Sequence, residues 1–303
     1  MKKPLFSCVI PVKGERPFFD EALASLKSQG MGDDLEIIVQ DVDVFNTKAQ
    51  WHGGTEDFRG SCGAGKNSSE SLCLCVEKNI DGVRWCKELD KGQSDALNKG
   101  FAKARGEWLF WLNADDVLLP GALKNLTQRL RVTEDCGDAF GASGVEWIAG
   151  DTIYLDKDGI ARDVRTDARW HSWFGRYLSV WTGGPSSFFR RRLLDMYGGF
   201  DVDLHYVMDI EMWTRWAKAG RRFVGVDNYI WGFRMHEGSK TMGGRNDNEY
   251  FAERMQVLQR CGLGKQSFWR NLTRFSSIVD GSWLKRVRDR KRFDGIHWKD
   301  LSL

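Results

Sequence analysis

The sequence lacks any apolar run of the roughly 18 to 20 residues that a membrane-spanning helix needs. Candidates such as residues 108–119 are interrupted by Asp, Arg or Lys. The N-terminus lacks a secretory signal, because its first apolar run breaks at Pro11 and Lys13, too soon for the apolar core of such a signal. These absences predict an intracellular, cytoplasmic protein that does not cross a bilayer.

Cysteine pairs with the spacing of a zinc site are also lacking. The seven cysteines include no C-x-x-C pair, and no histidine completes a usual zinc spacing around Cys62, Cys73, Cys75 and Cys86. A chain of 303 residues is large enough to fold without disulfide bonds. We therefore expect reduced thiols.

Strong net charge, internal repeats and low-complexity tracts are absent as well. The 45 Lys and Arg residues nearly balance 42 Asp and Glu, which leaves a net charge of +3. With 42% apolar and 29% charged residues, the composition is that of a globular chain and excludes a disordered or fibrous protein. No basic stripe runs through the body of the chain, so we expect no nucleic-acid partner.

The excess of basic residues lies at the C-terminal end of the chain. From residue 270 onward there are nine Lys or Arg against four Asp, so the preceding residues carry about −2. Trp283, Leu284, Val287 and other apolar residues interleave with these basic ones, which suits a helix lying on an anionic lipid surface. A solvated, partly ordered tail explains the same composition, and the sequence leaves both alternatives open.

Apolar runs typical of buried strands alternate with helical periodicity in the first half of the chain. We expect strands at residues 5–12, 35–39 and 108–112, and helices at residues 17–29 and 94–105. Strands without polar alternation that are separated by helices favour an α/β fold, with a mostly parallel sheet covered by helices on both faces. Ligands of such sheets bind beyond the carboxyl ends of the strands. Polar clusters at 11–15, 41–43 and 113–116 are therefore expected to converge on one crevice.

The remaining segments are less regular. From residue 46 to 82 the periodicity fails and Gly, Ser, Asn and Cys dominate, which predicts a long loop or insertion. In the second half we expect a turn at Asp158 and Gly159, strands at 187–190 and 222–226, and helices at 207–219 and 246–261. This pattern divides the chain into a domain at 1–245 and a helical, basic C-terminal extension at 246–303.

Two adjacent carboxylates follow the strand at 108–112. Asp115 and Asp116 repel each other, so a bound divalent cation is a natural compensation. Mg²⁺ or Mn²⁺ typically takes one or two protein carboxylates and fills its other positions with phosphate oxygens and water. The pair therefore points to a nucleotide diphosphate site, and the alternative is an Asp pair that caps the helix beginning near Pro120.

Six short blocks then occur in one order along the chain. They are SCVIPVK at 7–13, EIIVQD at 36–41, KGQSDALNKG at 91–100, ARGEWLFWLNADD at 104–116, MDIEMWTR at 208–215 and RMHEGSKT at 234–241. Together they resemble the family 2 inverting glycosyltransferases with a GT-A fold, a Rossmann-like α/β architecture, over roughly residues 5–45 and 83–245. The resemblance implies transfer of a sugar from a nucleotide diphosphate donor, usually a UDP-sugar, to an acceptor hydroxyl with inversion. It favours bacterial surface polysaccharide synthesis on the cytoplasmic face of the membrane.

The resemblance also implies roles for individual residues. The family's Asp-x-Asp element falls on Asn113 to Asp115, so Asp115 becomes the leading ligand for Mn²⁺ or Mg²⁺, with His236 as a second candidate. Asn113 departs from the family pattern, because an amide can accept a hydrogen bond but cannot neutralise a cation. The residues implied in donor binding are Pro11, Asp41, Lys91, Gln93, Asn98, Asn113, Asp116 and Lys240. Without any ligand, Ser94 as an N-cap would account for part of the third block.

Displacement of a nucleotide diphosphate also needs a base that takes the acceptor's proton on the opposite face of the sugar. In the family, the Asp that precedes the Trp of the fifth block is this base, which gives Asp209, with Glu211 as the substitute candidate. Met208 stands where relatives often have Glu. Favourable charge at a helix N-terminus is the alternative explanation for both carboxylates.

Two other functions fit less of the sequence. A nucleotidyltransferase would need a glycine-rich phosphate loop directly after the first strand, where this chain offers only Gly14. A non-catalytic nucleotide- or glycan-binding module remains an alternative, because Asn113 and Met208 depart from the family pattern. The implied partners are a nucleotide-sugar donor, a glycan or lipid-linked glycan acceptor, and a membrane surface contacted by the basic tail.

Overall fold

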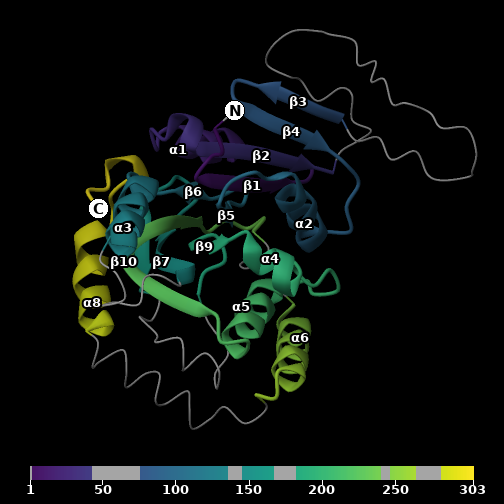
Figure 1. Cartoon of the computed structure of the whole chain (residues 1–303). Helices are drawn as coiled ribbons and strands as arrows, with labels where there is room; N and C mark the ends of the chain where they lie inside the picture. Colours follow the sequence, from purple (N-terminus) through teal and green to yellow (C-terminus); the bar gives the residue numbers. More distant parts are fainter. Residues whose placement is uncertain (1, 43–75, 136–144, 167–181, 240–245, 264–280) are drawn as a thin grey trace, which may run out of the picture.

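The protein, represented by a computed structural model, is described at residues 2–42, 76–135, 145–166, 182–239, 246–263 and 281–303. Within these ranges ten strands form one sheet in the order β3-β4-β2-β1-β5-β9-β7-β10-β6, with β8 paired to β7 (Figure 1). The strands are β1 (Phe6–Val12), β2 (Leu35–Asp41), β3 (Val76–Ile80), β4 (Val83–Lys87), β5 (Trp108–Trp111), β6 (Val117–Leu118), β7 (Val145–Leu155), β8 (Ala161–Arg165), β9 (Ser187–Arg190) and β10 (Arg222–Arg234). The α-helices are α1 (Phe19–Lys27), α2 (Gln93–Lys103), α3 (Ala122–Asp135), α4 (Arg192–Tyr197), α5 (Met208–Lys218), α6 (Asp247–Arg260) and α8 (Ser282–Phe293).

The N-terminal part of the sheet is parallel, as the sequence predicts. β1 pairs in parallel with β2 and β5, and β2 pairs in parallel with β4. Val12 at the end of β1 lies opposite Asp41 at the end of β2, so the carboxyl ends of β1, β2 and β5 meet at one edge. β9 runs antiparallel to both β5 and β7, and β10 runs parallel to β7. The carboxyl end of β10 therefore reaches the same edge as that of β5.

Alternating side chains of the strands make two apolar layers. On one face, Phe6, Cys8 and Ile10 of β1 pack with residues of α1 and α3. On the other face, Val9 of β1 and Trp111 of β5 pack with residues of α2, α4, α5 and α6. This division follows from the two-residue period of a strand, and it buries both faces of the parallel strands.

The structure extends the sequence-based prediction in three places. Residues 76–80, inside the predicted insertion, form β3, which pairs antiparallel with β4. The long β7 and its partner β8 have no counterpart in the sequence prediction, although the turn at Asp158 and Gly159 between them does. β10 runs on to Arg234 instead of ending at 226, because register shifts against β7 accommodate the polar residues at 227 and 228.

The prediction that Ser94 is the N-cap of α2 is wrong. Gly92, not Ser94, occupies the N-cap position, and its φ of 131° suits glycine. Ser94 is instead buried one residue inside the helix, where its hydroxyl contacts the carbonyl of Leu204 and the sulfur of Met208. The polar turn before α2 is stabilised by Asp90 and Asp95, which accept hydrogen bonds from backbone N–H groups.

The described part of the C-terminal segment packs on the sheet. Phe293, Trp298 and Leu301 share an apolar cluster with residues of β6, β7, β8 and β10. The backbone N–H of Trp298 donates to the carbonyl of Gly159 at 2.9 Å, in the turn between β7 and β8. None of the helices in the described ranges is both long and apolar enough to cross a membrane.

A buried carboxylate ties the first two strands to the segment after α2. Glu36 of β2 accepts hydrogen bonds from the Ser7 hydroxyl at 2.6 Å and from the Arg105 backbone and side chain, both at 2.8 Å. Burial alone would raise the pKa of Glu36, but these hydrogen bonds and the Arg105 charge lower it below its ordinary value. The carboxylate form is therefore favoured in the folded state.

Replacing Glu36 by Gln is expected to lower the free energy of unfolding by about 2 kcal/mol at pH 7. Because the folded pKa is depressed, this contribution is present above the unfolded pKa of about 4.3 and is lost as the pH falls through the folded pKa. Denaturant unfolding at a series of pH values measures it. The exposed Asp33→Asn variant is the control, and a Glu36→Gln difference that stays constant down to pH 3 would contradict the expectation.

Candidate functional site

The loop after β5 and the segment after β10 bring Asp115 and His236 together. The Oδ2 atom of Asp115 lies 3.0 Å from the Nε2 atom of His236. Both side chains are partly exposed, with 32% and 19% of their surface accessible to solvent. The two leading metal-ligand candidates, which lie 121 residues apart in the chain, are thus adjacent and accessible.

Asn113 and Asp116 form a fixed chain of hydrogen bonds behind this pair. Gln93 of α2 donates to the Asn113 side-chain oxygen at 3.0 Å, and the Asn113 amide nitrogen donates to Asp116 at 2.8 Å. An Asp at position 113 would place a second carboxylate against the buried Asp116. The departure from the family's Asp-x-Asp pattern therefore suits this chain, because an amide can accept from Gln93 and donate to Asp116, whereas an ionised carboxylate can only accept.

Asp116 is fully buried. Its Oδ1 atom accepts a hydrogen bond from the backbone N–H of Arg234 at 2.9 Å. Burial raises the pKa of the Asp116 carboxyl well above its ordinary value, and the charge of Asp115 raises it further. These contacts give Asp116 a positioning role for the loop after β5, and its predicted direct contact with a donor stays a prediction.

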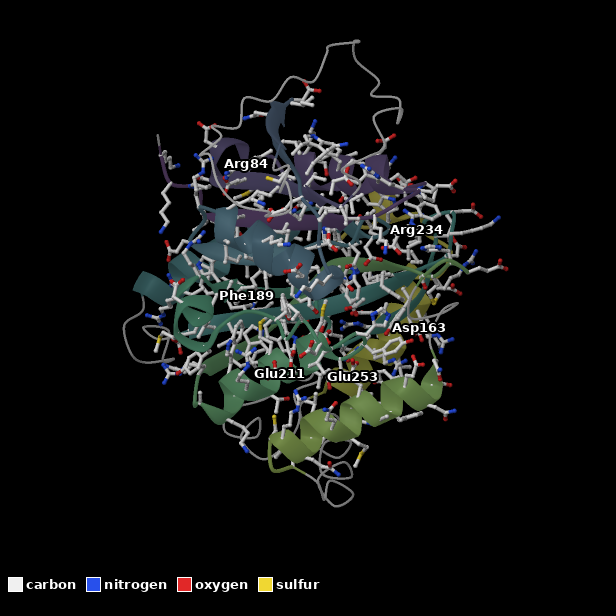
Figure 2. All side chains as sticks on the ribbon, turned by 90° about the vertical axis from the view of Figure 1, so that its right-hand side faces the viewer. Arg84, Asp163, Phe189, Glu211, Arg234 and Glu253 are labelled. Carbon is white, nitrogen blue, oxygen red and sulfur yellow. The ribbon has the colours of Figure 1, made fainter. Side chains whose placement is uncertain are left out.

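Arg234, at the end of β10, joins four parts of the chain, although its side chain is only 1% exposed (Figure 2). The guanidinium donates to the Asp115 carbonyl at 3.0 Å and the Lys157 carbonyl at 2.8 Å, and it forms an ion pair with Glu21 of α1. It also lies 4.5 Å from the centroid of the Phe18 ring, and that ring lies 5.1 Å from the ring of His236. Arg234 and Phe18 thus support both members of the Asp115–His236 pair from behind.

No role for Arg234 was predicted from the sequence. Its position at the end of an apolar strand could have indicated one, because an Arg at such a position needs buried partners for its charge.

Asp41, at the end of β2, is buried and already paired with cations. The Arg16 guanidinium lies 2.9 Å from its Oδ2 atom, and the Lys87 ammonium lies 3.8 Å from the same atom. Arg16 was also missed by the sequence analysis. Its placement after β1 brings a cation to the edge where Pro11 and Asp41 lie, so that two cations face the Asp41 carboxylate at the predicted nucleoside-binding end of the sheet.

Asp209 begins the first turn of α5 on the other side of the β5 end. A Cβ atom added to Gly184 would lie 2.3 Å from Trp111 of β5 and 3.1 Å from the Asp209 Oδ2 atom. The glycine therefore leaves the space into which the Asp209 carboxylate reaches. The loop before α5 is fixed by Glu253 of α6, which accepts hydrogen bonds from the backbone N–H of Tyr206 at 2.6 Å and of Val207 at 3.0 Å.

Glu211, the substitute base, is engaged elsewhere. Its carboxylate forms a two-point ion pair with Arg215, with N–O distances of 2.9 Å on both arms. Arg215 also donates to the carbonyl of Gly199 at 2.7 Å. Figure 2 labels Glu211 on the side of the molecule formed by α5 and α6. This arrangement favours Asp209 over Glu211 as the base.

The other predicted donor-binding residues have mixed placements. Lys91 is exposed in the turn before α2. Asn98 exchanges two hydrogen bonds with the Phe200 backbone, at 2.8 and 2.9 Å, so its amide stabilises the chain between α4 and α5. Lys240 lies outside the described residues. Direct donor contacts of these three residues stay predictions.

The donor set at Asp115 and His236 fits a divalent cation. Carboxylate and imidazole are both ligands of divalent cations, and the Asp115 and His236 atoms, which lie within hydrogen-bond distance of each other at 3.0 Å, are close enough to hold one ion together. In the described ranges no group of three His, Cys, Asp or Glu side chains could hold a metal on its own. Phosphate oxygens and water would therefore complete the shell, as is usual for Mg²⁺ at nucleotide sites.

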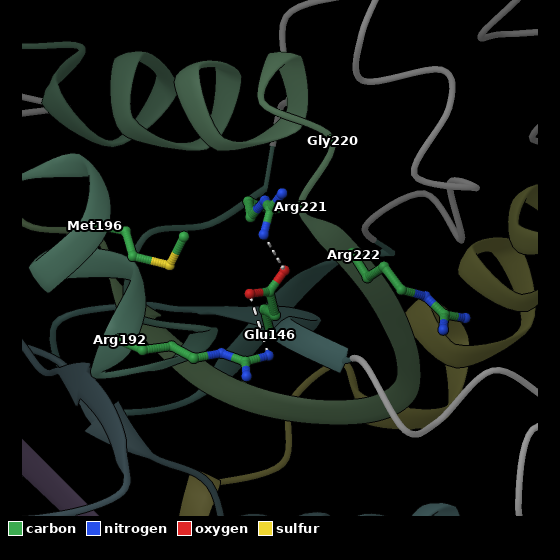
Figure 3. Close-up of a pocket in the computed structure, with 6 residues that line it drawn as sticks. All are labelled: Glu146, Arg192, Met196, Gly220, Arg221 and Arg222. Atoms are coloured by element: carbon green, nitrogen blue, oxygen red, sulfur yellow. Dashed lines mark ion pairs between the residues drawn. The ribbon is translucent and has the colours of Figure 1, made fainter.

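A hollow of about 440 Å³ lies elsewhere, at the edge where β7 and β10 begin. Buried Glu146 is flanked there by Arg192 at 3.2 Å and Arg221 at 3.7 Å (Figure 3). Arg222 lies opposite the first residue of β7, and Arg190 lies opposite Trp108 at the start of β5. This hollow is thus at the opposite sheet edge from Asp115 and forms no part of the candidate site.

Comparisons with known proteins agree with the fold. The family model described as glycosyl transferase family 2 matches residues 66–162. A 26% identical relative is the GalNAc(5)-diNAcBac-PP-undecaprenol beta-1,3-glucosyltransferase of Campylobacter jejuni, over 47% of this chain and 39% of its own length. An uncharacterised protein of Mycobacterium tuberculosis is also 26% identical, over 70% of this chain and 62% of that protein.

Among solved structures, TarS of S. aureus in complex with UDP-GlcNAc has a TM-score of 0.54 at 12% identity, over 83% of this chain and 65% of that one. Its complex with UDP gives a TM-score of 0.51. These likenesses identify the fold as GT-A. The chain spans less than two thirds of the length of each of these relatives.

Proposed function

We propose that this chain, which by sequence resemblance and GT-A fold is a family 2 glycosyltransferase, transfers a sugar from a UDP-sugar to a hydroxyl of a lipid-linked glycan. The observation that carries this proposal is the meeting of Asp115 and His236 at 3.0 Å, at the sheet edge near which Asp209 lies in the first turn of α5. A UDP-sugar donor is supported by the complexes of TarS with UDP and UDP-GlcNAc. A lipid-linked acceptor, and with it a role in surface polysaccharide synthesis, is supported by the name of the Campylobacter relative.

Asp115 and His236 would hold a divalent cation, Mn²⁺ or Mg²⁺, which supplies positive charge to the diphosphate of the donor when it is bound. Arg234 keeps Asp115 in place through its backbone carbonyl. Asn113 and Asp116 fix the rest of the loop, so the partly exposed Asp115 carboxylate rests on a rigid support. Such preorganisation is what an electrostatic site requires, since the chain need not rearrange as charge develops.

Asp209 would act as the base in a single displacement. The acceptor oxygen forms a bond to the anomeric carbon while the bond from that carbon to the diphosphate oxygen breaks, and Asp209 takes the hydroxyl proton. The configuration inverts because attack and departure occur on opposite faces of the sugar. The absence of a side chain at Gly184 leaves the Asp209 carboxylate accessible beside Trp111.

The test is turnover of isotopically labelled UDP-glucose, UDP-galactose and UDP-GlcNAc with and without Mn²⁺. Release of UDP shows transferase or donor hydrolase activity, and NMR of the product's anomeric proton reports inversion or retention. Nucleotide binding with no release of UDP from any donor, even with a lipid-diphosphate-linked glycan supplied, would favour the non-catalytic binding module instead.

The Asp115→Asn variant is expected to need about tenfold or more Mn²⁺ for half-maximal turnover, because an amide cannot balance the charge of the ion. Titration of Mn²⁺ at saturating donor measures this concentration, and electron paramagnetic resonance of free Mn²⁺ gives the affinity directly. The matched control is Asp158→Asn, which removes a carboxylate from the turn between β7 and β8. An unchanged Mn²⁺ dependence in Asp115→Asn would remove Asp115 from the metal site.

A further inference from the structure

Helix α8 turns apolar side chains away from the protein. With 100° between successive residues, Trp283, Leu284, Val287 and Lys291 share one side of the helix, which we call the outward face. Ser282, Asp289 and Phe293 lie on the opposite side and are buried. Trp283, Leu284 and Val287 are 53%, 63% and 42% exposed, respectively.

The polarity of α8 is inverted relative to an ordinary surface helix. Lys285 faces the sheet, where its ammonium pairs with Asp151 and Asp227 and lies 4.4 Å from the centroid of the Tyr229 ring. Asp289 accepts a hydrogen bond from the Tyr229 hydroxyl at 2.9 Å. A surface helix normally buries its apolar stripe and exposes its charges. Here the protein buries charged groups of α8, so the apolar outward face is left for another contact.

Basic residues surround this outward face. α8 contains six Lys or Arg residues and one Asp. Arg288 and Arg290, with side chains 71% and 62% exposed, flank the apolar residues. Lys291 lies on the outward face itself and forms no ion pair with any residue in the described ranges. Arg288 lies 2.8 Å from Asp289, and Arg286 and Arg290 share Asp163, so the basic residues of the helix still outnumber the carboxylates that pair with them. Exposed Trp and Leu beside this excess of basic residues match the interface of a bilayer that carries anionic lipids.

We propose that the outward face of α8 docks the protein on an anionic lipid bilayer, with Trp283 and Leu284 among the acyl chains and the basic side chains at the lipid phosphates. A second copy of this chain fits less well. A twofold contact would set the basic residues of one α8 against those of the other, and three apolar side chains fall short of the roughly 800 Å² that each partner buries in a stable dimer.

The segment that follows α8 is hydrogen-bonded to the elements that support the candidate site. The Gly295 N–H donates at 2.9 Å to the carbonyl of Ala161, the first residue of β8. In the turn that precedes β8, the Lys157 carbonyl accepts from Arg234 at 2.8 Å. Docking through α8 would therefore tie the support of the Asp115–His236 pair to the membrane-bound helix. Use of a lipid-linked acceptor rests on the proposed function, whereas the docking itself does not.

The test is co-sedimentation of the full chain with vesicles of phosphatidylcholine alone or mixed with phosphatidylglycerol. We expect binding to the mixed vesicles that weakens with added salt, and little binding to phosphatidylcholine. The double variant Trp283→Ser, Leu284→Ser is expected to weaken binding about tenfold or more. The matched control is Phe251→Ser, Met255→Ser on α6, which removes two side chains of similar exposure, 52% and 45%, and should bind like the parent.

Three outcomes would overturn the proposal. They are no binding to the mixed vesicles, equal loss in both double variants, and a dimer in analytical ultracentrifugation that only the α8 variant abolishes. The last outcome would assign the outward face to a second copy. Asp115→Asn should bind vesicles like the parent chain, so failure of the docking proposal and failure of the proposed transfer reaction are separate results.

Discussion

Asp209→Asn is expected to lower kcat for sugar transfer by about a thousandfold and to leave the Kd for UDP unchanged. The amide has nearly the shape of the carboxylate but cannot accept the acceptor's proton. Gly184 and Trp111 border the Asp209 carboxylate, so little rearrangement is expected on this replacement. Turnover of a labelled UDP-sugar gives kcat, and calorimetric titration gives the Kd for UDP.

Glu211→Gln is the comparison that separates the two candidate bases. Because Glu211 is paired with Arg215, we expect this variant to lose stability and to keep most of its kcat. A thousandfold loss in Glu211→Gln with normal folding, together with near-parental kcat in Asp209→Asn, would exchange the two roles. A parent chain that binds UDP but turns over no donor would support the binding-module alternative.

Arg234→Met is expected to cost about 3 to 5 kcal/mol in the free energy of unfolding. The replacement leaves the carbonyls of Asp115 and Lys157 without their donor and removes the partner of Glu21. For a domain of this size, such a loss corresponds to a fall in Tm of about 10 °C. Differential scanning calorimetry measures the shift.

Arg234→Lys extends this prediction to the site. A lysine has no planar fork and cannot reach the two carbonyls and Glu21 together, so Mn²⁺ affinity should fall even where the protein still folds. Arg260→Met is the control, because Arg260 forms a half-exposed ion pair with Asp201 at 3.0 Å on α6 and should cost under about 1 kcal/mol. A Tm for Arg234→Met within 2 °C of the parent would contradict the assigned role.

The parallel half of the sheet was predictable from the sequence because its strands are buried on both faces. Such strands read as unbroken apolar runs, as at 5–12 and 108–112, and their ends are marked by polar residues. The expected strand at 187–190 coincides with β9, and the helices expected at 207–219 and 246–261 correspond to α5 and α6. Residues that follow parallel strands were placed at one edge for the same reason.

The antiparallel half was not predictable in this way. β7 contains Glu146, Asp151 and Thr152, which are buried only because partners from distant segments neutralise or cover them. Lys285, which pairs with Asp151, lies 134 residues further along the chain. No local sequence pattern predicts an ion pair between residues so far apart in the chain. Arg16 and Arg234 could not be predicted either, because their partners are carboxylates and carbonyls contributed by other elements.

For the candidate site, the sequence identified side chains but not their supports. Asp115 and His236 were each predicted as metal ligands from the sequence. That they lie next to each other could be seen only in the folded structure. Asn113 was marked as a departure from the family pattern, and the hydrogen bonds to Gln93 and Asp116 give the departure its physical reason. Asn98 was predicted to bind the donor, and this stays a prediction, while its amide exchanges hydrogen bonds with the Phe200 backbone.

The dependence of Asp209 on Glu253 has a consequence for the order in which a ribosome makes this protein. Residues 1–245 include every side chain assigned here to the reaction, yet the carboxylate that fixes Tyr206 and Val207 emerges later. The turn beside Arg234 likewise waits for Trp298, which is also translated after residue 245. A nascent chain halted after residue 245 therefore carries the reacting groups without their alignment, and competence arrives only after α6 and Trp298 have been made.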